Sequence, residues 1–235
     1  MNLHENKKLF TDAVLAASEY LDIRPVYIEK DYWITRSLKL MTQNSNADKA
    51  IFKGGTSLSK CWHLIERFSE DVDIAISREF LGFSGELSRT QVSDKLRRAA
   101  CGFVREKMQY DVREAMIAQG INEESFSVRV QITSVSTTDP ETIEIEYKSA
   151  LPENSYIRHC VLIEVSGRSM QEPVRAEHVQ SLLDQYIPQS IVAEPVFILP
   201  NVVAPERTCL EKIFLLHEEF AKLNTDIRVN RMTRH

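Results

Sequence analysis

Two aspartates interrupt a short apolar run in the stretch DVDIAI, which covers residues 71–76. Side chains two positions apart on a β-strand point to the same face, so we expect Asp71 and Asp73 to emerge together. Two adjacent carboxylates repel each other and must be neutralised by basic neighbours or by a divalent cation. Mg²⁺ accepts such paired oxygen ligands and completes its coordination with waters and substrate phosphates. The pair is therefore a candidate magnesium site, and such a site needs phosphates nearby.

A candidate phosphate-binding turn precedes the aspartates. Gly54 and Gly55 lie between a predicted strand at 50–53 and a predicted helix at about 57–66. Because glycine has no Cβ, the backbone N–H groups can approach a phosphate at the positive end of that helix. The letters RFSE then turn the chain, and the return strand brings Asp71 back beside the glycines. Either motif alone is usually structural, but the two at this spacing favour a site for phosphoryl or nucleotidyl transfer.

Such a site needs a third carboxylate, either as a metal ligand or as the base that takes the proton of the attacking hydroxyl. Glu144 and Glu146 stand two apart on a predicted strand, but they share its face with Lys148 and are interpreted as a solvated surface. Glu164 is the only charge in the apolar run HCVLIEVSG, and burying a carboxylate without a partner is costly. Glu164 is therefore the preferred candidate.

Other kinds of catalytic site are not indicated. The six histidines form no H-x-x-x-H or H-E-x-x-H pattern, and G-x-S-x-G and G-x-x-x-x-G-K-[ST] are absent. The four cysteines are far apart and are interpreted as reduced core residues. The net charge of −5 argues against a broad nucleic-acid-binding surface. Basic residues do crowd one predicted helix, interpreted as a solvated face: Lys95, Arg97, Arg98, Arg105 and Lys107.

The elements that position these residues follow from hydrophobic periodicity. Helices are predicted over the periodic apolar residues from Leu3 to Ala17, from Pro25 to about Met41, and at about 57–66, 90–119, 176–186 and 205–223. Strands are predicted at 50–53, 71–76, 126–133, 142–148, 159–167 and 191–199. This order predicts an α+β fold with a mixed, twisted sheet that is flanked by helices, and with further helices at the N- and C-terminal ends.

The apolar runs are too short to span a bilayer, and the N-terminus has no apolar signal region. We therefore expect a cytoplasmic protein with no membrane association. A chain of 235 residues can bury one sizeable core. We expect an N-terminal helical segment at 1–48 packed on a core at 49–200, and at 201–235 the start of a truncated C-terminal helical region.

The stretch FKGGTSLSK…IERFSEDVDIAI resembles the nucleotidyltransferase toxins of the AbiEii/AbiGii type, which belong to the DNA polymerase β-like superfamily. Three flanking motifs agree with this family: IEKDYWITRSL at 28–38, VLIEVSGRSMQEP at 161–173 and PERTCLEKIFLLHEE at 205–219. The resemblance covers nearly the whole chain. It implies a polymerase β-like nucleotidyltransferase core at 49–200.

The resemblance also implies roles for single residues. Gly55 and Thr56 match the Gly-Ser of the superfamily's phosphate-binding turn, and Gly54 and Ser57 lie beside them. Lys212 matches the helix lysine that in this family is thought to contact the phosphates of the nucleotide.

The acidic residues match as well. Asp71 and Asp73 correspond to the metal-binding pair of the superfamily, and Glu164 falls in the strand where its third acidic residue is expected. Lys53 and Arg168 are further candidates for positive charge near the phosphates. The resemblance thus implies two Mg²⁺ ions as cofactors and an NTP as substrate.

The function implied by the family is transfer of NMP from an NTP to an acceptor hydroxyl, by a toxin of an abortive-infection or toxin–antitoxin system. The expected partners are a cognate antitoxin and an RNA acceptor such as the 3′ end of tRNA. Two alternatives are a protein-nucleotidylating enzyme and an inactive NTP-binding module. The second follows from the end of the sequence at Arg234-His235, where family members commonly continue into a Tyr-rich segment that ends in Asp-Leu.

Overall fold

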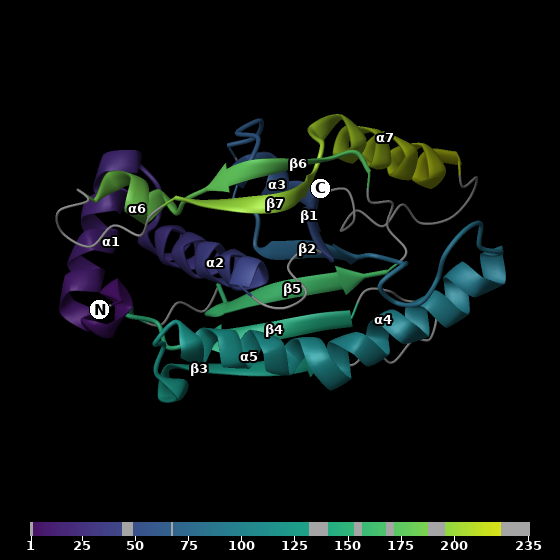
Figure 1. The fold of residues 1–235 in the computed structure, drawn as a ribbon. Coiled ribbons are helices and arrows are strands. Elements are labelled where there is room, and N and C mark those ends of the chain that lie inside the picture. The colour runs from purple at the N-terminus through teal and green to yellow at the C-terminus, as the bar shows by residue number, and fades with distance from the viewer. Residues whose placement is uncertain are drawn as a thin grey trace.

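A seven-stranded mixed sheet forms the centre of the molecule (Figure 1). The computed structural model describes residues 2–43, 49–66, 68–131, 141–152, 157–167, 172–187 and 196–221. The strands are β1 (Ala50–Lys53), β2 (Asp71–Ile76), β3 (Phe126–Gln131), β4 (Glu141–Tyr147), β5 (Cys160–Ser166), β6 (Val174–Val179) and β7 (Phe197–Val203). Their order across the sheet is β3-β4-β5-β2-β1-β7-β6. The β2–β5 and β1–β7 pairs are parallel and the other pairs are antiparallel.

The helices flank this sheet. They are α1 (Lys7–Leu21), α2 (Pro25–Gln43), α3 (Gly54–Lys60), α4 (Arg97–Phe103), α5 (Gln109–Ala118), α6 (Leu182–Tyr186) and α7 (Pro205–Ala221). Wider π-helical turns at Gln91–Leu96 and Val104–Met108 join α4 and α5 into one long helical rod, which confirms the helix predicted at 90–119. Short 3₁₀ turns lie at Leu3–Glu5 and Glu123–Ser125. The predicted α+β fold with a mixed sheet flanked by helices is confirmed.

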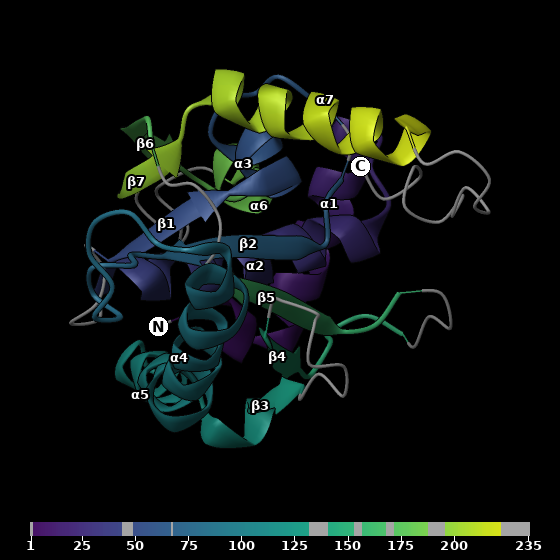
Figure 2. The ribbon, with the colours of Figure 1, turned by 90° about the vertical axis from the view of Figure 1, so that its right-hand side faces the viewer.

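The two faces of the sheet differ in chemistry, because side chains alternate along each strand. One face of β2, β4 and β5 carries apolar residues such as Val72, Ile143 and Ile163, which are fully buried. They share a single core with α1, α2 and α5. In Figure 2, α7 crosses the opposite end of the molecule from the rod of α4 and α5. The other face of β2 and β5 carries the charged residues of the candidate site.

Three predicted elements were placed wrongly at their ends. The helix predicted at 57–66 is α3, which begins at Gly54 because a positive φ of 80° there turns the chain directly out of β1. The first part of the helix predicted at 176–186 is strand β6, because it pairs with β7, and only Leu182–Tyr186 is helical. The strand predicted at 191–199 is β7, which runs from Phe197 to Val203, while 191–195 lie outside the described residues.

The cysteines are free, and three of the four are buried as predicted. Cys209 is exposed on α7, so its assignment to the core is wrong. The outward side of this helix also exposes apolar residues, among them Leu210, Ile213, Phe214 and Phe220, and a periodic apolar pattern is therefore not proof of burial here. None of the helices in the described part of the chain is long and apolar enough to cross a membrane.

Candidate active site

The glycine turn is joined to the aspartate strand by a hydrogen bond from a buried side chain. Strand β1 ends at Lys53 and α3 starts at the next residue. Within the first turn of α3, Ser57 Oγ donates to Gly54 O at 2.8 Å. Thr56 Oγ1 donates to the backbone oxygen of Asp71, across the loop that separates α3 from β2. Because both hydroxyl side chains are buried, the turn and the start of β2 are held as one unit.

Gly54 lies so close to Asp73 that no other residue fits. A Cβ built at Gly54 would be 1.9 Å from Asp73 Oδ2, far inside van der Waals contact. The backbone of Gly54 also has a φ of 80°, which L side chains rarely adopt. Two independent structural features thus require a glycine at position 54, and the first of them shows that Asp73 lies against the predicted phosphate turn.

The predicted acidic residues stand on one face of the sheet. Asp73 pairs with Lys53 on the antiparallel neighbour β1 and with Glu164 on the parallel neighbour β5. Paired residues of adjacent strands point to the same side, so these side chains form a row across three strands. Asp71 precedes Asp73 by two positions on the same face. All three residues are of intermediate exposure, so none of them is buried in the core.

The carboxylate oxygens of this row are not close enough together to coordinate one metal ion in the part of the chain that the structure describes. Among the residues that the structure describes, no three His, Cys, Asp or Glu side chains are arranged closely enough to hold a metal ion. The backbone register aligns the carboxylates, and rotation about their side-chain torsions has to bring the oxygens together. The donor set itself, carboxylate oxygens on one half-buried face, suits a hard divalent cation.

Asp73 has a strongly perturbed acidity. Burial raises its pKa from 3.8 to about 6, Lys53 and Lys212 oppose this rise, and the charges of Asp71 and Glu211 add to it. Lys212 on α7 is therefore near enough to Asp73 to act on it electrostatically, which places this predicted residue at the same site. A carboxylate whose pKa is raised by burial in a cleft is a common feature of functional sites.

Glu211 is a neighbour of the candidate site that the sequence analysis did not single out. Its Oε2 atom is 3.4 Å from Lys53 Nζ, and its Oε1 atom is 3.3 Å from Arg207 Nε. It thereby connects α7 with the end of β1, beside the glycine turn. Its position could have pointed to it, because Glu211 directly precedes Lys212 on the helix that carries the buried Thr208. Arg168, the other predicted source of positive charge, lies outside the described residues.

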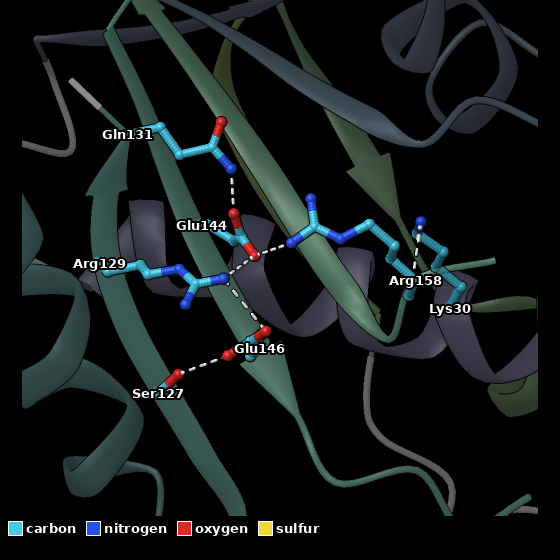
Figure 3. A network of polar contacts seen from close by, with 7 residues as sticks. All are labelled: Lys30, Ser127, Arg129, Gln131, Glu144, Glu146 and Arg158. Atoms are coloured by element: carbon cyan, nitrogen blue, oxygen red, sulfur yellow. Dashed lines mark hydrogen bonds and ion pairs between the residues drawn. The ribbon is translucent and has the colours of Figure 1, made fainter. Parts of the chain in front are cut away.

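The interpretation of Glu144 as a solvated residue is wrong. Its side chain is 1% exposed, because Arg129 and Arg158 cover it (Figure 3). Arg129 Nη2 donates to Glu144 Oε1 at 2.7 Å, and Arg158 Nη2 and Gln131 Nε2 also donate to this carboxylate. Glu146 is half exposed and takes a weaker contact of 3.2 Å from Arg129. The preference for Glu164 over Glu144 as the third carboxylate remains a prediction.

The basic residues of the long helical rod are largely neutralised. Arg98 pairs with Asp94 at 2.9 Å, Lys107 pairs with Asp111 at 2.7 Å, and Arg105 pairs with the buried Glu141. Acidic partners thus offset the charge of three of the five basic residues that were singled out on this rod. A second group of basic residues near the end of the sequence, Arg228, Arg231 and Arg234, lies outside the described residues.

The fold and the site together define a class of protein: an α+β protein in which a strand, a Gly-Gly turn, a helix and an Asp-x-Asp strand form one unit. The sequence profile described as "Nucleotidyl transferase AbiEii toxin, Type IV TA system" matches residues 37–231. The chain belongs to this family, and the resemblance predicted from its motifs is confirmed.

No curated protein matches the chain. Among solved structures, it is similar to MenT4, the nucleotidyltransferase toxin Rv2826c from Mycobacterium tuberculosis H37Rv, at 19% sequence identity and a TM-score of 0.48. The match covers 85% of this chain and 57% of that chain, so this chain spans little more than half the length of that toxin.

Proposed function

We propose that this protein is a Mg²⁺-dependent nucleotidyltransferase that moves NMP from an NTP to an acceptor hydroxyl, and that it is the toxin of a type IV toxin–antitoxin pair. The observation that carries the proposal is the contact between the glycine turn and Asp73, with Glu164 beside Asp73 in the sheet register. Family membership over residues 37–231 supports the same reaction and implies a cognate antitoxin. The composition that predicts a cytoplasmic protein agrees with this role.

The residues present fit a divalent cation. Asp71, Asp73 and Glu164 offer carboxylate oxygens on one face, and burial of Asp73 disfavours its ionised form unless a positive charge is supplied. These three residues would hold the metal, and two ions are proposed by analogy with the superfamily. When bound, Mg²⁺ supplies charge stabilisation for the oxygens of the phosphate and of the attacking hydroxyl.

The protein's own groups would orient the nucleotide. Residues 54–57 present backbone N–H groups next to Asp73, and Lys53 and Lys212 supply positive charge for the triphosphate. The acceptor oxygen then attacks the α-phosphorus in line, and the bond to pyrophosphate breaks as the new P–O bond forms. Glu164 is the proposed base for the proton of the acceptor hydroxyl. Most of the rate enhancement would come from positioning and electrostatics.

The acceptor is proposed to be RNA, with the 3′ end of tRNA as the first substrate to test. Purified protein is incubated with Mg²⁺, each labelled NTP in turn, and either total RNA or a protein extract. We expect label in the RNA fraction, and its loss in Asp71→Ala/Asp73→Ala. Label in the protein fraction instead would establish the alternative of protein nucleotidylation. Binding of Mg-NTP by calorimetry without transfer to either fraction would establish an inactive binding module.

A further inference from the structure

Three consecutive charged residues on α2 are buried in the interior of the protein. Glu29, Lys30 and Asp31 are 0%, 1% and 6% exposed. Neighbouring positions on the same helix are apolar and buried, including Ile28 and Tyr32. Buried charges contribute little net stability compared with apolar residues of similar size, since their desolvation offsets the attraction between them. A run of three such charges on a core helix therefore needs a reason other than stability.

Asp31 holds the far end of the helix that begins with the glycine turn. Its Oδ1 atom is 2.5 Å from Lys60 Nζ, and both side chains are less than a tenth exposed. Its Oδ2 atom accepts from Leu182 N at 2.7 Å, at the start of α6. Helix α3 has only seven residues, and side-chain contacts hold both of its ends. Near its start Thr56 donates to the backbone oxygen of Asp71 on β2, and at its end Lys60 pairs with Asp31 on α2.

Lys30 holds the residues that lead into the two acidic strands. Its Nζ atom is 2.6 Å from Glu70 Oε2, and Glu70 is the residue before Asp71. The same Nζ donates to the backbone oxygen of Arg158 at 3.3 Å, two residues before β5 begins (Figure 3). One buried ammonium thus joins the approaches to β2 and β5, which carry the candidate carboxylates.

Glu29 contacts the residues that directly follow β4. It accepts from Ser149 Oγ at 2.7 Å and from Ala150 N at 2.8 Å. The three charges of α2 thereby contact the ends of α3, β2, β4 and β5. All of these segments carry or adjoin the candidate site, although α2 itself contributes no side chain to it.

We infer that Glu29, Lys30 and Asp31 are positioning residues that set the glycine turn and the acidic strands relative to one another. The inference rests on the proposed function for its effect on catalysis. Its structural part does not depend on catalysis, because the contacts bind the segments together whether or not an NTP is turned over. Asp31 acts on the turn through Lys60 and α3, and Lys30 acts on Asp71 through Glu70.

The test separates positioning from stability with a double-mutant cycle in the full chain: Asp31→Asn, Lys60→Met and the two together. Each single change leaves one buried group without its charged partner, which is strongly destabilising, whereas the double change removes both charges and recovers stability. Val14→Ala is the matched control, because Val14 is fully buried on α1 and makes none of these contacts. Lys30→Met tests the contacts of Lys30, because it removes the partner of the half-exposed Glu70 and the donor to the backbone oxygen of Arg158.

The first measurement is amide hydrogen exchange without nucleotide. We expect the segment 54–60 to exchange at least tenfold faster in the double variant and the segment 68–73 to do so in Lys30→Met. In Val14→Ala neither segment changes beyond the shift expected from global stability. Wild-type exchange in both segments of the charged-residue variants overturns the inference, whatever the enzyme does.

The second measurement is the rate of NMP transfer. We expect the double variant to raise KM for the NTP at least tenfold with a smaller effect on kcat, because the turn that holds the phosphates is displaced. Lys30→Met should mainly lower kcat, because Asp71 is displaced. A double variant with wild-type KM and kcat overturns the catalytic part. Absence of transfer in the wild type, with exchange altered as expected, refutes the proposed function and leaves the positioning inference intact.

Discussion

Two groups of acidic residues occupy the same face of the sheet and differ in how their charge is balanced. Glu144 on β4 accepts from two arginines and a glutamine, and these contacts lower its pKa even though burial alone would raise it. Asp73 on β2 lies beside two lysines, yet burial raises its pKa to about 6. The first group is balanced by the fold itself, and the second favours an added cation.

The difference arises from the neighbouring strands, not from the acidic motifs. Both motifs are acid-x-acid pairs on strands that pair with β5. Strand β4 lies next to β3, which supplies Arg129 and Gln131 directly across from it. Strand β2 lies next to β1, which ends in the glycine turn. The position across from Asp73 is therefore taken by Lys53 and the backbone of this turn, and not by an arginine that donates to the carboxylate. Identical spacing thus yields an internal ion-pair network in one case and a candidate metal site in the other.

The strongest test of this comparison neutralises, one at a time, the two glutamates that could serve as the third carboxylate. We expect Glu164→Gln to lower nucleotidyl transfer at least about 10²-fold, because a charge that stabilises the transition state is removed. Glu144→Gln should leave transfer within about threefold in the same assay, once the protein is shown to be folded. A large loss in Glu144→Gln together with a small loss in Glu164→Gln would reverse the assignment.

A second test uses two glycines with similar backbones and different surroundings. Gly54 and Gly82 have φ values of 80° and 87°, but a Cβ at Gly82 meets nothing within 4 Å. Both Gly→Ala changes cost about 1–2 kcal/mol of backbone strain. Gly54→Ala also collides with Asp73, so we expect a further loss of stability, measured by urea unfolding, and loss of NTP binding. Equal effects of both changes would show that the contact with Asp73 is unimportant.

A third test compares the pH dependence of stability in the absence of divalent cations. The folded-state pKa of Asp73 is about 6, above its ordinary 3.8, so its stabilising contribution is present below 3.8 and is lost as the pH rises through 6. We expect Asp73→Asn to be more stable than the wild type at pH 7.5, by on the order of 2 kcal/mol, and the gain to vanish near pH 4.

Glu144 should show the opposite trend in the same experiment. Its pKa is lowered, so its contribution is present above the ordinary value of 4.5 and is lost as the pH falls through the folded-state pKa. Glu144→Gln should therefore cost stability at neutral pH and less in acid. Urea unfolding of both variants with EDTA, from pH 8 down to about pH 3, provides the measurement, because the contribution of Glu144 is lost only below its ordinary pKa of 4.5. Parallel curves for the two variants would remove the distinction between the two groups.

The smallest expected effect concerns the rim of the arginine network. Glu146 is about half exposed and its contact to Arg129 is 3.2 Å long. Exposed ion pairs of this kind contribute little, so Glu146→Gln should change the free energy of unfolding by less than about 0.5 kcal/mol. A loss equal to that of Glu144→Gln would mean that the network acts as one unit and does not depend mainly on its buried member.

Local sequence pattern was sufficient for most of the elements and for the glycine turn followed by the Asp-x-Asp strand. Strands β1 and β2 begin and end where the sequence pattern predicted, and the closeness of Gly54 to Asp73 was anticipated, because both depend on residues close together in the chain. The strand β6 was not anticipated. Its sequence alternates weakly, and only pairing with β7 makes it a strand.

The sequence by itself determined the fold class, the family and the candidate carboxylates, since periodicity and motif spacing are properties of neighbouring residues. Only the tertiary structure decided how deeply each charged side chain is buried and which groups it pairs with. Burial and partners come from segments far apart in the chain: Arg129 and Arg158 over Glu144, Glu211 beside Lys53, and Lys60 and Glu70 against α2. The acidity of a carboxylate follows from the desolvation and charge that these distant segments impose, which no local pattern contains.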